Sequence, residues 1–130
     1  MISDVQRFFD AYRDAFNRLD PVAIAAHFAV PSMLTSTGGD ALWTDAAQIQ
    51  RNMVVLCDRY RAAGFVAARY EPLHDLDLPP DHVVAHLRWT VERRDLPPWS
   101  FRTGYHLRRR AETWRILLCI AYEEPEKVRA

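Results

Sequence analysis

Two tyrosines are the residues of this chain that could most directly assist a reaction. A phenol hydroxyl can donate a hydrogen bond to a carbonyl or enolate oxygen and so stabilise negative charge that develops there. Tyr12 lies on the apolar stripe of a predicted helix, and Tyr105 lies on the apolar side of a predicted strand. We therefore predict that both hydroxyls point inward as candidate catalytic groups. The alternative is that each is a core aromatic whose hydroxyl bonds to a backbone carbonyl or to water.

Other side chains on the same inward surfaces are predicted to line a ligand pocket. Most are apolar, and Ser36 and Thr103 would add small polar groups, although either hydroxyl could instead bond to the backbone. The expected ligand is a small apolar or aromatic molecule. The predicted ligand-binding set is Tyr12, Phe16, Ser36, Trp43, Met53, Trp89, Phe101, Thr103, Leu118 and Tyr122.

The sequence contains no motif that would hold a cofactor or a metal ion. A glycine-rich phosphate loop, a nucleophile elbow and a zinc ligand set are all absent. His82 and His86 would lie roughly 13 Å apart on a strand, too far to share one ion. Cys57 and Cys119 lack metal-ligand spacing and fall in different predicted elements. We expect no cofactor, no metal, and free thiols in a reducing, cytoplasmic compartment.

Hydrophobic periodicity predicts the elements that position these residues. Three helices are expected: over residues 4–19, from Asp20-Pro21 to a point before Pro31, and from Thr44 or Asp45 to Gly64. A short strand at 31–37 precedes a turn and the third helix. Alternation with a period of two predicts four more strands, at about 65–76, 81–93, 99–110 and 113–123. The order ααβαββββ predicts one α+β domain over residues 1–130, with a strongly curved antiparallel sheet.

Composition and charge exclude several classes of partner. The chain has 17 basic and 17 acidic side chains among 130 residues, which makes nucleic acid an unexpected ligand. No stretch approaches the roughly 20 apolar residues that a membrane span needs. We expect neither a nucleic-acid partner nor a membrane partner.

The last predicted strand is apolar on both faces over its second half. Trp114, Ile116, Leu118, Ile120 and Tyr122 alternate there with Arg115, Leu117, Cys119 and Ala121. Either the strand lies in a two-sided core, or a second subunit covers its outer face. We favour the subunit, and predict a homodimer through the outer sheet face with Leu117, Cys119 and Ala121 in the contact.

Two stretches carry a resemblance to a known superfamily. The order of elements, "FFDAYRDAFNRLDPVAIAAHF" at residues 8–28 and "ETWRILLCIAY" at 112–122 resemble the nuclear transport factor 2-like superfamily, which includes ketosteroid isomerases and SnoaL-type cyclases. The resemblance covers nearly the whole chain. It implies a cystatin-like cone, in which three N-terminal helices close a bent sheet over a pocket. It says little about activity, because this fold hosts unrelated functions.

The ketosteroid isomerase pattern is only partly present. The resemblance places the oxyanion-donating tyrosine on Tyr12 and the second oxyanion donor, an acid in the isomerases, at or next to Tyr105. The general base, an aspartate in those enzymes, falls on Ser36. A serine cannot take a proton from carbon at neutral pH without an activating base, so steroid isomerisation is disfavoured.

Three functions stay open at this point. The chain could be a small-molecule binding domain with an apolar pocket, or a cofactor-independent isomerase, lyase or cyclase in which Tyr12 and Tyr105 polarise a substrate oxygen. It could also be a dimeric interaction module with a filled core. An enzyme would need a base in the pocket, and by parity no acidic residue or histidine of the predicted strands points there. Asp10 and Asp14 are the nearest alternatives, on the polar side of the first helix.

Overall fold

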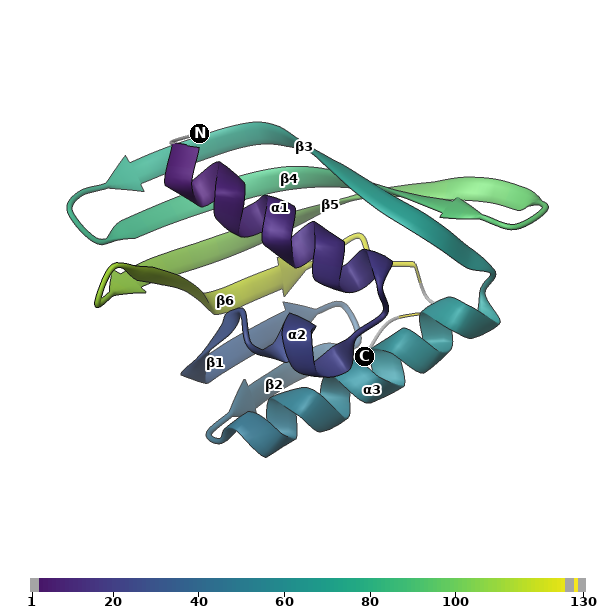
Figure 1. Cartoon of the computed structure of the whole chain (residues 1–130), viewed down its shortest axis with the longest axis horizontal. Helices are drawn as coiled ribbons and strands as arrows, with labels where there is room; N and C mark the ends of the chain where they lie inside the picture. The colour runs from purple at the N-terminus through teal and green to yellow at the C-terminus, as the bar shows by residue number, and fades with distance from the viewer. Residues whose placement is uncertain (1–2, 126–127, 129–130) are drawn as a thin grey trace.

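Three helices and a six-stranded sheet make up the computed structural model, which describes residues 3–125 and 128. The first helix, α1 (Ser3–Asn17), buries the apolar stripe that its periodicity predicts, including Val5, Phe9 and Tyr12. Figure 1 shows α1 crossing in front of the sheet. None of the helices in the described part of the chain has the length and apolar character that a membrane crossing requires.

The second helix, α2 (Pro21–Ala25), begins as predicted and ends early. Asp20 caps it, because its side chain accepts a hydrogen bond from the Ala23 amide at 3.1 Å, and Pro21 occupies the first turn. Phe28, expected to be an inward helical residue, instead begins a strand, where it pairs with Ile116. Pairing with a distant strand therefore ends the helix sooner than local periodicity suggests.

The third helix, α3 (Ala46–Ala62), has the ends that the sequence predicts. Of the two candidate caps, Asp45 is the one used, and it forms a reciprocal capping box with Gln48. Gly64 follows the helix with φ +87°, a conformation that favours glycine because it has no Cβ.

The sheet is mixed, whereas an antiparallel sheet was predicted. Its strands lie in the order β2-β1-β6-β5-β4-β3, and β1 runs parallel to β6. Strand β2, at the edge, was predicted as a turn before Trp43, so the observed order is ααββαββββ. The strands are β1 (Phe28–Ser36), β2 (Gly39–Trp43), β3 (Phe65–Leu78), β4 (His82–Arg93), β5 (Leu96–Arg110) and β6 (Thr113–Ala121).

The hairpin of β4 and β5 forms the inner wall of the sheet. Leu87 pairs with Thr103 and Trp89 pairs with Phe101, so one set of alternate side chains faces the helices. The turn lies at Arg94-Asp95, and the two prolines after it belong to β5. The predicted inward residues are all buried, which confirms this face: Leu87, Trp89, Val91, Phe101, Thr103, Tyr105 and Leu107.

The predicted faces of β6 are wrong in the second half of the strand, because the strand contains a β-bulge. Leu107 pairs with Ile116 and His106 pairs with Leu118, so Leu117 is an extra residue without a partner across this ladder. The extra residue inverts the alternation beyond it. Cys119 and Ala121, predicted on the outer face, are buried inside. The side chains of Leu118, Ile120 and Tyr122 lie on the outer face instead.

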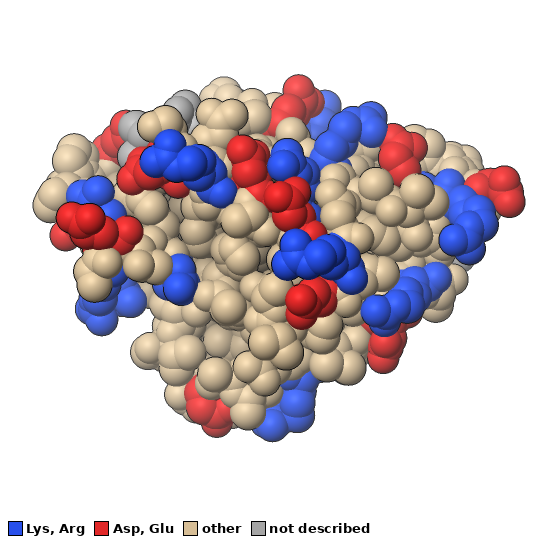
Figure 2. Space-filling model, viewed as in Figure 1, with Lys and Arg blue, Asp and Glu red and all other residues tan. Residues whose placement is uncertain are grey.

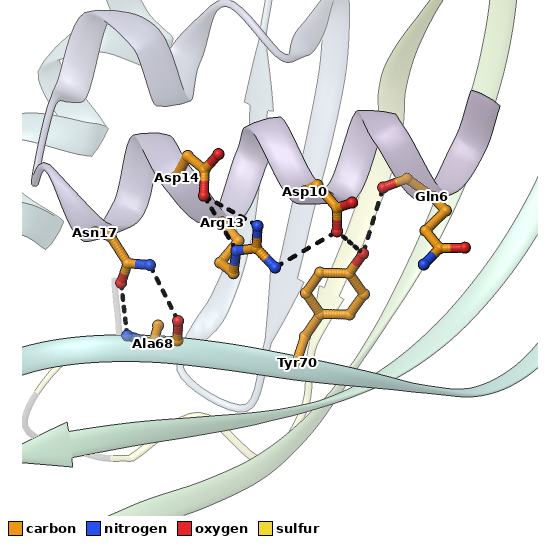
Figure 3. Close-up of polar contacts among 7 residues, drawn as sticks. All are labelled: Gln6, Asp10, Arg13, Asp14, Asn17, Ala68 and Tyr70. Atoms are coloured by element: carbon orange, nitrogen blue, oxygen red, sulfur yellow. Dashed lines mark hydrogen bonds and ion pairs between the residues drawn. The ribbon is translucent and has the colours of Figure 1, made fainter. Parts of the chain in front are cut away.

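A polar seam joins α1 to the edge strand β3 (Figure 3). The Asn17 side chain donates to the Ala68 carbonyl at 3.2 Å and accepts from the Ala68 amide at 2.6 Å, so it pairs with the strand as a neighbouring backbone would. Tyr70 donates to the Asp10 carboxylate at 2.5 Å. Arg13 forms ion pairs with Asp10 and Asp14. Both acidic residues therefore lie outside the cone, and neither can act as a base inside it.

Charges of both signs are interspersed on the face that carries the helices. Figure 2 shows basic and acidic side chains scattered among other residues, without a large area of one sign. This arrangement agrees with the formal net charge of zero. Nothing on this face provides the continuous basic surface that binding to a polyanion requires.

Candidate functional site

A cavity lies between the helices and the inner face of the sheet. Its volume, defined as the space that the centre of a water molecule can occupy, is about 60 Å³. A single water needs about 10–15 Å³ on this measure, so the cavity has room for roughly four to six. Its wall is formed by Tyr12, Phe16, Phe28, Leu34, Asn52, Met53, Leu56, Tyr60, Phe65, Ala68, Trp89, Val91, Phe101, Thr103, Tyr105, Cys119, Ala121 and Glu124.

Strands β4 and β5 place a hydrogen-bonded polar group in this wall. The indole N–H of Trp89 donates to Thr103 Oγ1 and to the Tyr105 hydroxyl, at 3.1 Å each. All three residues are buried, and Thr103 is only 4% exposed. Burial raises the pKa of Tyr105, so this hydroxyl keeps its proton at neutral pH. A neutral phenol can still donate to a molecule in the cavity.

Two further tyrosines line the cavity from the helices. Tyr12 lies on α1 and Tyr60 on α3, and the two are 3% and 4% exposed. Neither hydroxyl has a hydrogen-bond partner among residues 3–125 and 128. Buried hydroxyls usually have a partner, from the protein or from water. The cavity therefore offers two hydrogen-bonding groups for a molecule that enters it.

Sequence reasoning missed the one carboxylate that the described residues contribute to the wall, that of Glu124. This half-buried residue follows β6, and its charge acts on the buried phenols. Burial is the main reason that the pKa values of Tyr12 and Tyr60 are raised, and the Glu124 carboxylate raises both further. The alternation rule could not find Glu124, because it applies only within a strand. The one available signal was an acidic pair that directly follows an apolar strand.

The structure brings together most of the predicted site residues. Seven of them line the cavity: Tyr12, Phe16, Met53, Trp89, Phe101, Thr103 and Tyr105. Asn52, which precedes Met53 on α3, was also missed; it lies at the polar edge of the predicted apolar stripe.

Four predicted site residues lie elsewhere. The Ser36 hydroxyl donates to the Gly39 carbonyl at 3.1 Å and accepts from the Gly38 amide, so it stabilises the β1–β2 turn. Trp43 is buried against the ring of Phe28 behind the cavity wall. Leu118 and Tyr122 lie on the outer sheet face because of the bulge, and Tyr122 bonds there to His86 at 2.6 Å.

The histidines do not assemble a metal centre in the described part of the chain. His82 and His106 lie on the outer face and share a hydrogen bond at 2.8 Å. No group of three or more His, Cys, Asp or Glu side chains in residues 3–125 and 128 could hold an ion. His27 bonds to the Ala23 carbonyl at 2.8 Å, and burial lowers its pKa. Cys57 and Cys119 are both free and buried.

Comparison with known proteins places the sequence in a family. Residues 3–124 match the family model described as "NTF2-like protein (DUF6841)". No curated protein matches the chain.

Several solved structures share the fold at low sequence identity. An NTF2-like protein of unknown function from Shewanella oneidensis has a TM-score of 0.72 at 16% identity, covering 92% of this chain and 97% of its own. A ketosteroid isomerase-like protein from Erwinia carotovora atroseptica has a TM-score of 0.68 at 17% identity, with coverages of 93% and 94%. A domain from Thiobacillus denitrificans, provisionally described as a calcium/calmodulin-dependent protein kinase type II association domain, has a TM-score of 0.75 at 18% identity. The match covers 92% of this chain and 94% of that domain. At these identities the similarity concerns the fold.

Proposed function

The chain belongs to this family of NTF2-like proteins, and on that premise we propose that its cavity binds one small aromatic molecule. The observation that carries the proposal is a pair of buried tyrosines, Tyr12 and Tyr60, that line a mostly apolar cavity and whose hydroxyls have no partner among the described residues. Small-molecule sites combine such apolar walls with a few convergent polar groups. A core filled by its own side chains would leave no such space.

The volume of the cavity limits the ligand to about one ring. Four to six waters correspond to about 120–180 Å³ of liquid, which is close to the volume of a benzene ring with a short substituent. A steroid is several times larger. A polycyclic substrate would therefore require the helices to move away from the sheet, and we favour a ligand with a single ring.

Titration with 2-phenylethanol tests this proposal. We expect saturable binding with a Kd of about 1 mM or tighter, by calorimetry and by a change in tryptophan fluorescence, because a ligand of this size can gain roughly 4–6 kcal/mol. Tyr12→Phe, which removes one hydroxyl and keeps the ring, should weaken binding by about three- to tenfold. Val54→Phe, on the exposed side of α3, serves as the matched control. Absence of saturable binding by any single-ring alcohol, amine or ketone would contradict the proposal.

We also propose that a second copy of the chain covers the outer face of the sheet. The outer patch consists of Leu76, Val84, Leu118, Ile120 and Tyr122, of which Val84 and Ile120 are each 39% exposed although they lie in central strands. Arg88 pairs with Glu71 beside it, and Arg102 pairs with Glu123, so a carboxylate offsets each of these two outer-face cations. A two-fold contact would cover the patch on both copies at once. One neighbour in structure is described as an association domain, which agrees with this use of the fold.

Sedimentation tests the proposed dimer. We expect a dimer at micromolar concentration, and Ile120→Arg should shift it toward monomer because two like charges would meet in a contact of roughly 1,000 Å² or more. Val55→Arg, on the exposed side of α3, should leave the dimer intact. A native protein that sediments as a monomer at this concentration would refute the proposal.

A further inference from the structure

We infer that mild acid separates the proposed dimer, because a cluster of histidines in its contact takes up protons that the contact disfavours. The inference rests on the proposed dimer and states what regulates it. Four of the five histidines of the chain lie on the outer face of the sheet, among the residues of the outer patch. These four are His74, His82, His86 and His106, while the fifth, His27, bonds to helix α2.

The register of the sheet places two of these histidines inside the outer patch. His106 on β5 lies between Val84 on β4 and Leu118 on β6, which are its direct partners in the two ladders. His86 on β4 reaches across β5 and bonds to the Tyr122 hydroxyl at 2.6 Å. A second copy that covers the patch would therefore also take both of these rings out of water.

His82 and His106 share a hydrogen bond that two protons would break. Nδ1 of His82 and Nε2 of His106 are 2.8 Å apart. One nitrogen must donate and the other must accept, so at least one of the two rings is neutral while the bond exists. If both rings are protonated, both nitrogens carry hydrogens and two positive charges face each other. Burial lowers the pKa of His106, and His82 and Arg108 lower it further.

The charged groups that face this pair are basic. Arg108 lies opposite His82 across the ladder of β4 and β5, and Arg115 on β6 lies opposite Arg108. Neither arginine has an ion-pair partner among residues 3–125 and 128. From β3, Leu78 pairs with His82 and brings no charge. Asp81, which precedes His82 in the sequence, already pairs with an arginine of β5. A second proton on the histidine pair would therefore add to positive charge that is already present.

Charges of both signs surround the other two histidines. The rings of His74 and His86 stack with their centroids 6.1 Å apart. Asp75 follows His74 in the sequence, but its position in β3 pairs with Ala85, which is on the buried face. Because the nearby ion pairs are internally balanced, a proton on either histidine adds net positive charge to the contact. These ion pairs are Glu71 with Arg88, and Glu123 with Arg102.

The contact between two copies would disfavour protons on all of these rings. A charged imidazole loses hydration when a second copy covers it, and a two-fold contact doubles the number of such charges. The separated chains therefore bind more protons than the dimer does, so the dimer weakens as the pH falls. Histidine is the side chain that changes charge between about pH 5 and 8, whereas most Asp and Glu side chains stay ionised there.

Sedimentation of the native protein at about pH 7.5 and about pH 5.5 tests the inference. We expect the Kd of the dimer to be at least about tenfold weaker at the lower pH, because the separated chains hold protons that the contact excludes. The monomers formed at the lower pH should keep the circular dichroism spectrum of the folded protein.

A double variant assigns the effect to the hydrogen-bonded pair. His82→Gln combined with His106→Gln removes two proton acceptors and keeps polar side chains, so the change in Kd between the two pH values should fall to about threefold or less. The comparison is a ratio within one variant, so a general weakening of the dimer cancels. The matched control is His27→Gln, which removes the one histidine outside the cluster and should retain the change seen in the native protein.

The possible failures are distinguishable. A native protein that is monomeric at the higher pH refutes the proposed dimer itself. A native dimer whose Kd is the same at both pH values, or tighter at the lower one, overturns the inference and leaves the dimer standing. The inference is also overturned if the double variant keeps the full change, or if the native chain unfolds at the lower pH instead of separating into folded copies.

Discussion

Replacing Cys119 with aspartate should lower the free energy of unfolding by at least about 3 kcal/mol, because it buries a carboxylate inside the cone. Cys119 is only 4% exposed, and burial already raises the pKa of its thiol. Ile120→Asp, one residue away on the outer face, should cost about 1 kcal/mol or less within a single chain, since Ile120 is 39% exposed. Any further loss from the proposed dimer contact should depend on protein concentration. Urea denaturation at two protein concentrations would measure both values and reveal any change in self-association.

The comparison is a direct test of the bulge at Leu117. Without the extra residue, the alternation would place Ile120 inside and Cys119 outside. A larger loss of stability for Ile120→Asp than for Cys119→Asp would therefore show that β6 has the simpler register, and that Ala121 and Cys119 do not line the cavity.

Filling the cavity should abolish ligand binding. Ala121 is buried and lines the cavity, so Ala121→Phe would place a ring in the space that a ligand needs. We expect at least about a hundredfold loss of affinity for 2-phenylethanol, beyond detection by calorimetry. Overpacking should cost about 1–3 kcal/mol of stability and leave the variant folded, which circular dichroism can check.

The control for this variant is a substitution of the same size at the surface. Val54 is 46% exposed on α3, so Val54→Phe should leave the affinity unchanged. If folded Ala121→Phe binds 2-phenylethanol as the native protein does, the ligand lies outside the cavity.

The parts of the fold that could be predicted from sequence are those that local patterns determine. The alternation from Leu87 to Leu107 gives one buried face, because only one of its two sets of residues is apolar. The caps Asp20 and Asp45 were recognisable because a capping side chain acts within three residues along the chain. The same inward face contains Trp89, Thr103 and Tyr105, and this part of the candidate site followed directly from it.

The features that were missed depend on pairing between distant segments. In β6 both alternating sets are apolar, so a shift by one residue leaves the hydrophobic pattern equally good and the pattern cannot locate a bulge. Strand β2 exists because Trp43 and its neighbours pair with β1. The parallel pairing of Phe28 with Ile116 joins two strands that are far apart in the sequence. Glu124 follows the last strand, where no periodicity indicates the direction of a side chain.

The indole N–H signals of the four tryptophans provide the most direct test of the central claim, that the cavity binds a small aromatic molecule. Trp89 lines the cavity, whereas the indole of Trp114 donates to Asp4 and Trp99 packs under Arg93. Titration of ¹⁵N-labelled protein with 2-phenylethanol should shift the Trp89 signal, assigned with Trp89→Phe, along a saturable curve while the signals of Trp99 and Trp114 stay in place. A saturable shift of Trp99 or Trp114 with an unmoved Trp89 signal, or no shift at saturating ligand, would contradict the claim.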